Sequence, residues 1–215
     1  MGMNRKEVLD PVESPIQDTE REMLTSSSMR QDEAHVRGAY DYLYGVGMCA
    51  RFGCIAAHIR SLDRHAILDL GCGIGSLRSY LDAGVHYHGI DIAPSAISRA
   101  QSNFHNMAGT TFELADIRNL AGREWSYDCV VWAGIGHAYG RTGGEDAVGW
   151  REVLNLANDL LLPGGLLIPE TIVEYEETMA HVIVGYNLVS SWQVSCMNGP
   201  VHSRRIGWVL ERKGN

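Results

Sequence analysis

A glycine-rich turn follows an apolar, strand-like run in ILDLGCGIGSL, residues 67–77. Its glycines lack a Cβ, so a ligand can lie directly against the backbone there. Two carboxylates accompany the turn. Asp69 stands two residues before Gly71, and Asp91 follows Gly71 by twenty residues, at the end of the next strand-like run. A carboxylate there can accept hydrogen bonds from both hydroxyls of a ribose. These residues predict a site for a nucleoside cofactor, either a dinucleotide or an adenosyl compound.

The spacing of the glycines narrows the choice of cofactor. A phosphate-binding P-loop is excluded because no Gly-Lys-Ser/Thr follows the turn. The turn reads G-x-G-x-G, whereas the turns of nicotinamide-dinucleotide sites read G-x-G-x-x-G. A dinucleotide cofactor is therefore disfavoured, and so is the function that would use it, an NAD-dependent dehydrogenase.

Strand-like and helix-like segments alternate around the turn. The predicted strands are 66–70, 85–91, 111–114, 127–132 and 166–168. The predicted helices are about 75–83, 96–106 with Ser95 as its cap, and 145–162, which ends at Pro163-Gly164-Gly165. This alternation predicts an α/β fold with a Rossmann-like, doubly wound, mostly parallel sheet. In such a sheet, ligands bind beyond the carboxyl ends of the strands, where the glycine turn is predicted to lie.

The tail of the chain, residues 171–215, has a different character. We expect a helix near 174–187, followed by two strands at 192–197 and 205–211. The turn Asn198-Gly199-Pro200 between these strands favours an antiparallel hairpin that closes the sheet edge.

The N-terminal part, residues 1–60, is predicted to be a polar arm followed by a helical lid. Its apolar groups have helical spacing that is broken at Gly45 and Gly47. Residues 61–170 form the expected cofactor-binding core. Because the chain of 215 residues has no internal repeat and no long linker, we expect a single domain spanning residues 1–215.

Composition disfavours several classes of protein and site. A formal net charge of −8 disfavours binding to nucleic acid, and no run approaches the roughly 20 apolar residues of a membrane span. The five cysteines include no C-x-x-C pair, so we expect reduced thiols, a cytoplasmic location and no metal site. A monomer or a homodimer is expected.

Five motifs, in order, resemble those of the class I S-adenosylmethionine-dependent methyltransferases of the small-molecule type. The turn LDLGCGIG looks like the family signature D/E-x-G-x-G-x-G. Four further segments of this sequence resemble the second to fifth motifs of the family, in this order: YHGIDIAPSAISRAQ, FELADIRNL, YDCVVWAGIGHAY and LLPGGLLIPE. Together they cover about residues 60–170, and the predicted antiparallel tail matches the seven-stranded sheet of the family. The resemblance implies methyl transfer from S-adenosyl-L-methionine.

The same resemblance implies which residues surround this cofactor. Around its methionine part they are Gly71, Cys72 and Gly73, with Asp69 near the ammonium. At the nucleoside end, Asp91 would bind the ribose and Ile92 would pack on the adenine. Asp116 would accept from the adenine amino group and Ile117 would donate its backbone N–H. From the sequence alone, Asp69 and Asp91 could instead be strand-end or capping residues, and Asp116 a loop or capping residue.

Two further cofactor contacts are less determined by the motifs. Trp132, at the end of the fourth strand, would line the cofactor near the sulfonium, although core packing is an equal alternative. Arg51, in the N-terminal helical region, would meet the cofactor carboxylate, although the motifs do not fix this contact and a solvated helix residue is the favoured alternative.

The loop after the fourth strand faces the methyl group in this family, and here it carries His137 and Tyr139. His137 is the candidate general base, because its ordinary pKa of about 6.5 suits proton removal near neutrality. Tyr139 would orient the substrate, and Tyr40 and Tyr44 would contact it from the lid. A structural role for His137 and ordinary packing of the tyrosines are the alternatives.

The loop lacks the D/N-P-P-Y/F motif of enzymes that methylate adenine, cytosine or glutamine. We therefore expect a small-molecule substrate with an oxygen acceptor, such as a secondary metabolite or a sugar-linked group. The alternatives are methylation of a protein or RNA side chain and a non-catalytic cofactor-binding scaffold.

Overall fold

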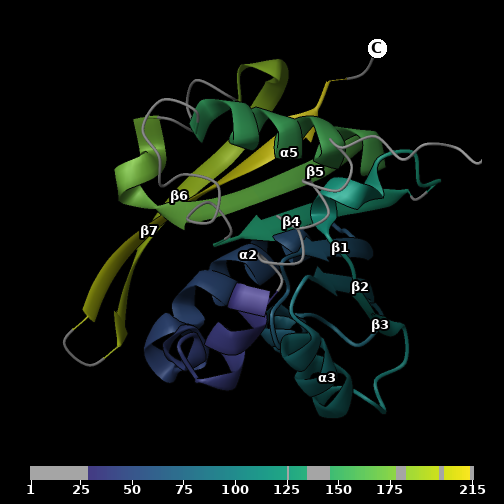
Figure 1. Ribbon diagram of the computed structural model, residues 1–215. Coiled ribbons are helices and arrows are strands. Elements are labelled where there is room, and N and C mark those ends of the chain that lie inside the picture. Colours follow the sequence, from purple (N-terminus) through teal and green to yellow (C-terminus); the bar gives the residue numbers. More distant parts are fainter. Residues whose placement is uncertain (1–28, 125, 135–145, 178–182, 199–200, 214–215) are drawn as a thin grey trace, which may run out of the picture.

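A seven-stranded sheet in the order β3-β2-β1-β4-β5-β7-β6 forms the centre of the protein (Figure 1). The computed structural model describes residues 29–124, 126–134, 146–177, 183–198 and 201–213. The parallel strands are β1 (Ala66–Leu70), β2 (His86–Asp91), β3 (Thr110–Leu114), β4 (Tyr127–Ala133) and β5 (Leu161–Ile172). β7 (Val201–Arg212) runs antiparallel to both β5 and β6 (Tyr186–Asn198), so the two last strands form a hairpin. The predicted fold class is confirmed.

The order of the strands reverses at β1, which pairs in parallel with both β2 and β4. The chain leaves β1 toward one side of the sheet and later returns on the other side. The elements that follow β1, β2 and β4 therefore diverge at the carboxyl ends of these strands, which is where ligands bind in open α/β sheets. The predicted glycine turn lies at this point, directly after Leu70.

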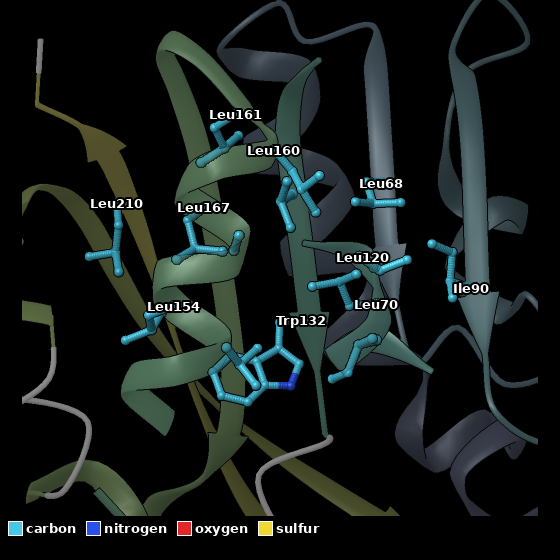
Figure 2. Close-up of a cluster of buried hydrophobic side chains, with 14 of the residues drawn as sticks. Leu68, Leu70, Ile90, Leu120, Trp132, Leu154, Leu160, Leu161, Leu167 and Leu210 are labelled. Atoms are coloured by element: carbon cyan, nitrogen blue, oxygen red, sulfur yellow. The ribbon is translucent and has the colours of Figure 1, made fainter. Parts of the chain in front are cut away.

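Two apolar clusters cover the two faces of the sheet. On one face, α5 (Asp146–Leu160) and the short η4 (Ile117–Leu120) pack on the strands through the side chains that Figure 2 shows. On the other face, α2 (Cys49–Ser61) and η3 (Ser76–Tyr80) pack on the sheet. Phe52, Ile55 and Ile59 recur at helical spacing along the buried side of α2. Burying each such side chain stabilises the fold by roughly 1.5–3 kcal/mol.

The N-terminal region is helical and interrupted, as the glycines predict. Residues 29–36 are helical and are followed by η1 (Asp41–Tyr44) and η2 (Val46–Met48) before α2 begins. In Figure 1 this region lies beside α2 and near α3 (Pro94–Asn103). The hydroxyl of its Tyr44 lies close to Gly73, so the region borders the glycine turn.

Some predicted elements differ from the observed ones. The helix predicted at about 75–83 is only the short η3, and β5 begins at Leu161 rather than at 166. Leu161 pairs with Tyr127 ahead of a register shift, so sheet pairing extends the strand back through Pro163-Gly164-Gly165.

The helix predicted near 174–187 lies partly outside the described residues. The described part begins with η5 (Val173–Tyr175) and two helical residues, 176–177, and continues with η6 (Ile183–Gly185). Only the C-terminal bound of the prediction is wrong, because β6 already begins at Tyr186, where it pairs with β7.

The N-cap predicted for α3, Ser95, is wrong. α3 begins one residue before Ser95, with Pro94 in its first turn and Ala93 as the N-cap. The N–H of Ser95 donates instead to the side chain of Asp32, 2.7 Å away. A residue of the N-terminal region therefore caps α3, which fixes that region against the end of β2.

None of the described helices is long and apolar enough to cross a membrane.

Candidate functional site

The glycine turn, Gly71–Gly75, is tied by its backbone to the end of β2. The N–H groups of Gly71 and Cys72 both donate to the carbonyl of Ile90, at 2.8 and 2.9 Å. Gly71, Gly73 and Gly75 have φ of 70°, 54° and 78°, which only glycine adopts without strain. The turn is therefore a fixed backbone surface beside the last residues of β2.

Asp91 joins the turn to the start of α3. One carboxylate oxygen accepts from the N–H of Gly73 at 2.8 Å, and the other accepts from the N–H of Ala93 at 2.9 Å. Each oxygen has a second lone pair, so the carboxylate can still accept two hydrogen bonds from a ligand. Ile92 is half-buried beside it. The side chain of Cys72 packs toward Gly89 of β2, so only the backbone of Cys72 remains for a ligand.

Tyr44 lies over the glycine turn. A Cβ placed on Gly73 would be 2.7 Å from the Tyr44 hydroxyl oxygen. Burial and the charge of Asp91 both raise the pKa of Tyr44, so its hydroxyl stays protonated. Tyr40 belongs to the same N-terminal region, and its hydroxyl donates to the side chain of Gln31 at 2.7 Å.

Asp69 is a buried carboxyl at the end of β1. It is 4% exposed and accepts a 2.5 Å hydrogen bond from the hydroxyl of Tyr87. Burial raises the pKa of Asp69 to about 7, although the Tyr87 hydrogen bond and the charge of Arg51 work in the opposite direction. The nearby charge of Asp91 raises it further. A cation placed beside Asp69 would favour its ionised form.

Arg51, Glu170 and Arg205 form a buried group that we call the charged cluster. Arg205 binds Glu170 through Nε at 2.5 Å and Nη2 at 3.0 Å, and Arg51 Nη1 lies 3.7 Å from the same carboxylate. Arg51 is 3% exposed, so the solvated alternative is wrong. Its Nε and Nη1 have no hydrogen-bond partner among the described residues. Two guanidinium groups share one carboxylate, which leaves a net positive charge and unused donors.

Gly134, at the end of β4, makes room for the charged cluster. A Cβ at this position would lie 3.2 Å from Arg205 Nη2 and 3.3 Å from both Nη atoms of Arg51. Gly134 also has a φ of 78°, and its N–H donates to the carbonyl of Glu170 at 2.9 Å. The end of β4 is therefore locked to the cluster by its backbone.

Three predicted residues lie on the α5 side of the sheet. Trp132 is 1% exposed and packs within the apolar cluster between α5 and the strands (Figure 2). Ile117 belongs to the same cluster. The carboxylate of Asp116 accepts hydrogen bonds from three groups of Arg118: the backbone N–H at 2.9 Å, Nε at 3.0 Å and Nη2 at 2.7 Å. Burial opposes the ionisation of Asp116, but these contacts lower its pKa overall.

The structure thus brings together Asp69, Gly73, Asp91, Arg51 and Tyr44. His137 and Tyr139 lie outside the described residues. The described residues contain no group of three or more His, Cys, Asp or Glu that could hold a metal ion.

Sequence reasoning missed Tyr87, Glu170 and Arg205. Glu170 follows the predicted fifth strand much as Asp91 ends the second, so a search for acids at strand ends could have found it. Tyr87 and Arg205 carry no such signal. Arg205 reaches the site only because β7 pairs with β5 in a register that places it opposite Ile172.

Comparison with known proteins agrees with this geometry. Residues 67–165 match a family model described as a methyltransferase domain. A segment of 60 residues is 39% identical to the "Putative methyltransferase Rv1506c" of Mycobacterium tuberculosis. That segment covers 26% of this chain and 36% of the relative, so the chain matches about a third of the length of that protein.

Solved structures of methyltransferases share the fold. The N-methyltransferase NodS of Bradyrhizobium japonicum, in complex with S-adenosyl-L-homocysteine, aligns with a TM-score of 0.66 at 16% identity. The alignment covers 79% of this chain and 89% of NodS. Magnesium protoporphyrin IX methyltransferase of Synechocystis, with bound SAM, aligns with a TM-score of 0.64 at 16% identity, over 85% and 96% of the two chains.

Proposed function

We propose that the protein is a class I S-adenosylmethionine-dependent methyltransferase that transfers a methyl group to a small-molecule acceptor, because residues 67–165 match a family model described as a methyltransferase domain. An oxygen atom is the proposed nucleophile. The observation that carries the proposal is a pair of complementary groups beside the glycine turn: a buried carboxyl, Asp69, and a buried guanidinium with unused donors, Arg51. The methionine part of the cofactor is a zwitterion that offers an ammonium to the first and a carboxylate to the second.

Each end of the cofactor has its proposed partners. Asp69 holds the ammonium and Arg51 the carboxylate, beside the backbone of Gly71, Cys72 and Gly73. The free lone pairs of Asp91 accept from the ribose hydroxyls.

The adenine contacts rest on weaker support. Ile92 is half-buried next to Asp91 and packs on the adenine ring in this proposal. Asp116 and the backbone N–H of Ile117 receive the adenine edge, which requires Asp116 to share its carboxylate with Arg118. Trp132 acts from within the core, as the wall behind the sulfonium.

When bound, S-adenosylmethionine supplies an electrophilic methyl group on its sulfonium. The main task of the protein is then to align the nucleophile with the methyl group and to exclude water. Tyr44 covers the glycine turn and, together with Tyr40, is proposed to close the acceptor site. His137 is proposed to take the proton of the acceptor hydroxyl, and Tyr139 to orient it. Both follow Gly134 in the chain, the residue locked to the charged cluster.

Isothermal titration calorimetry of the full chain tests the cofactor assignment. We expect S-adenosyl-L-homocysteine to bind with micromolar affinity and NAD to give no heat. Heat with NAD and none with S-adenosyl-L-homocysteine would overturn the proposal in favour of a dehydrogenase.

The acceptor needs a separate test, because the similar structures include both an N-methyltransferase and a carbon methyltransferase. Formation of S-adenosyl-L-homocysteine is followed with panels of alcohols, phenols, amines and thiols. We expect turnover with hydroxyl compounds, and we expect His137→Ala and Tyr139→Phe to keep cofactor affinity while losing turnover. Transfer of a labelled methyl group only to macromolecules of a cell extract would favour a protein or RNA substrate. Unchanged turnover in both variants would contradict their proposed roles.

A further inference from the structure

His35 is a buried polar residue that the proposed site does not use. It lies in the helical segment 29–36 and is 8% exposed. Its ring packs on the ring of Tyr40, with 4.8 Å between centroids, and its Nδ1 has no hydrogen-bond partner in the part of the chain that the structure describes. A buried polar atom without a partner is unfavourable, so its presence suggests that a ligand supplies one.

Two contacts hold the segment around His35 against the end of β2. Asp32 accepts from the N–H of Ser95 at 2.7 Å, at the start of α3. Asp41 pairs with Arg99 of α3 at 3.3 Å. Because α3 begins three residues after Asp91, these contacts fix His35 near the carboxylate that is proposed to bind the ribose.

The charged groups that influence His35 come from four elements packed around it. Asp91 from β2, Asp32 from its own helix and Asp41 from η1 all favour its protonated form, whereas Arg99 from α3 opposes it. Burial is the largest influence and lowers the pKa of His35, so the imidazole is neutral at neutral pH. A neutral imidazole has one N–H donor and one acceptor nitrogen.

We propose that His35 is a cofactor-binding residue that donates a hydrogen bond from Nδ1 to one ribose hydroxyl of the adenosyl group. The chemistry is complementary, because a hydroxyl that gives its only proton to Asp91 still has lone pairs to accept the imidazole N–H. His35 and Asp91 then bind the same hydroxyl from opposite sides. The inference rests on the proposed function and adds a contact from the N-terminal region.

The test compares S-adenosyl-L-homocysteine with its 2′-deoxy and 3′-deoxy analogues by calorimetry. The wild type is expected to bind one analogue about tenfold or more weakly than the parent. His35→Phe keeps a ring against Tyr40 but has no donor. We expect it to bind the parent about three- to tenfold more weakly, and to lose less than the wild type when that same hydroxyl is removed. The control Arg37→Ala changes an exposed neighbour and should match the wild type.

His35→Asn provides a second variant, because its amide nitrogen can stand near the position of Nδ1. We expect it to retain part of the discrimination between the parent and the analogue. If both variants lose as much as the wild type when either hydroxyl is removed, His35 only packs against Tyr40, and the inference is overturned while the proposed function stands. Absence of S-adenosyl-L-homocysteine binding to the wild type would overturn both.

Discussion

The glycine turn and the charged cluster are built in opposite ways, although both lie at the carboxyl ends of the parallel strands. The turn and Asp91 come from one short stretch of sequence, and hydrogen bonds from backbone N–H groups, at 2.8–3.0 Å, hold them together. The charged cluster draws Arg51 from α2, Glu170 from β5 and Arg205 from β7, and contacts between side chains join the three charges.

The two constructions have different energetic consequences. A carboxylate that accepts backbone N–H groups at a strand end keeps spare lone pairs and needs no other charged group. Two buried guanidinium groups around one carboxylate cost desolvation energy, which is offset only when each donor finds a partner. The unused donors of Arg51 leave this offset incomplete. The cluster is therefore a place where an anionic ligand would stabilise the protein, and the turn is a place where a ligand adds to an arrangement that is already complete.

Removing the charge at the centre of the cluster gives the largest expected effect. Glu170→Gln keeps the size of the side chain but leaves two buried guanidinium groups without a counter-charge. We expect the free energy of unfolding to fall by about 3–5 kcal/mol, measured by chemical denaturation. The control is Asp82→Asn, which breaks an exposed pair with Arg60 and should leave the free energy of unfolding close to that of the wild type. Equal losses in the two variants would show that the cluster is not an energetically distinct region.

Replacing Asp91, the carboxylate that holds the glycine turn, should weaken cofactor binding as well as change stability. Asp91→Asn removes a charged acceptor of the ribose, so we expect the affinity for S-adenosyl-L-homocysteine to fall about 10- to 150-fold. Asp128 is a matched control, because it also accepts two backbone N–H groups, from His65 and Ala66 at 2.8 and 2.9 Å. These residues lie at the start of β1, the opposite end of the strand from the turn. Asp128→Asn should lower stability and leave affinity unchanged; an equal loss of affinity would contradict the assignment of Asp91.

The same difference explains which features could be predicted from the sequence. The turn, Asp69, Asp91 and the parallel strands depend on neighbours in the chain, where glycine spacing and apolar runs carry the information. The partners of Arg51 depend on the register of β7 against β5, which no local pattern encodes. Glu170 and Arg205 were therefore missed, and the helix expected near 174–187 was placed too far toward β6 for the same reason.

Side-chain orientation was the other feature that the sequence left undetermined. Trp132 was expected either at the cofactor or in the core, and the structure places it in the core cluster beneath α5. Cys72 is within the turn, but its side chain faces Gly89. Alternation along a strand predicts two faces but does not say which face the ligand approaches.

Asp69 joins the two regions, and its raised pKa makes cofactor binding depend on pH. Its folded pKa of about 7 lies above the ordinary 3.8. The stability that it contributes to the free protein is therefore full below about pH 4 and is lost as the pH rises through 7. The cofactor ammonium needs the ionised form, so affinity changes in the opposite sense. We expect S-adenosyl-L-homocysteine to bind about tenfold more tightly at pH 8 than at pH 6, with release of a proton.

Asp69→Asn checks the origin of this pH dependence. The variant should bind weakly at every pH, and the tenfold change between pH 6 and pH 8 should disappear. The proton release is measured by calorimetry in buffers of different ionisation enthalpy. A variant that keeps the wild-type pH profile would assign the titration to another group and remove the link between the two regions.

The smallest expected effect tests how closely Tyr44 covers the turn. Gly73→Ala and Gly122→Ala both place a Cβ at positive φ, 54° and 77°, which costs about 1–2 kcal/mol of stability. Only the first meets another group, the Tyr44 hydroxyl at 2.7 Å, whereas nothing lies within 4 Å of the second. We expect Gly73→Ala to cost about 0.5 kcal/mol more than Gly122→Ala, and Tyr44→Phe to remove that excess in the double variant. Additive losses in the double-mutant cycle would mean that Tyr44 moves away from the turn freely, in which case the N-terminal region does not close tightly over the site.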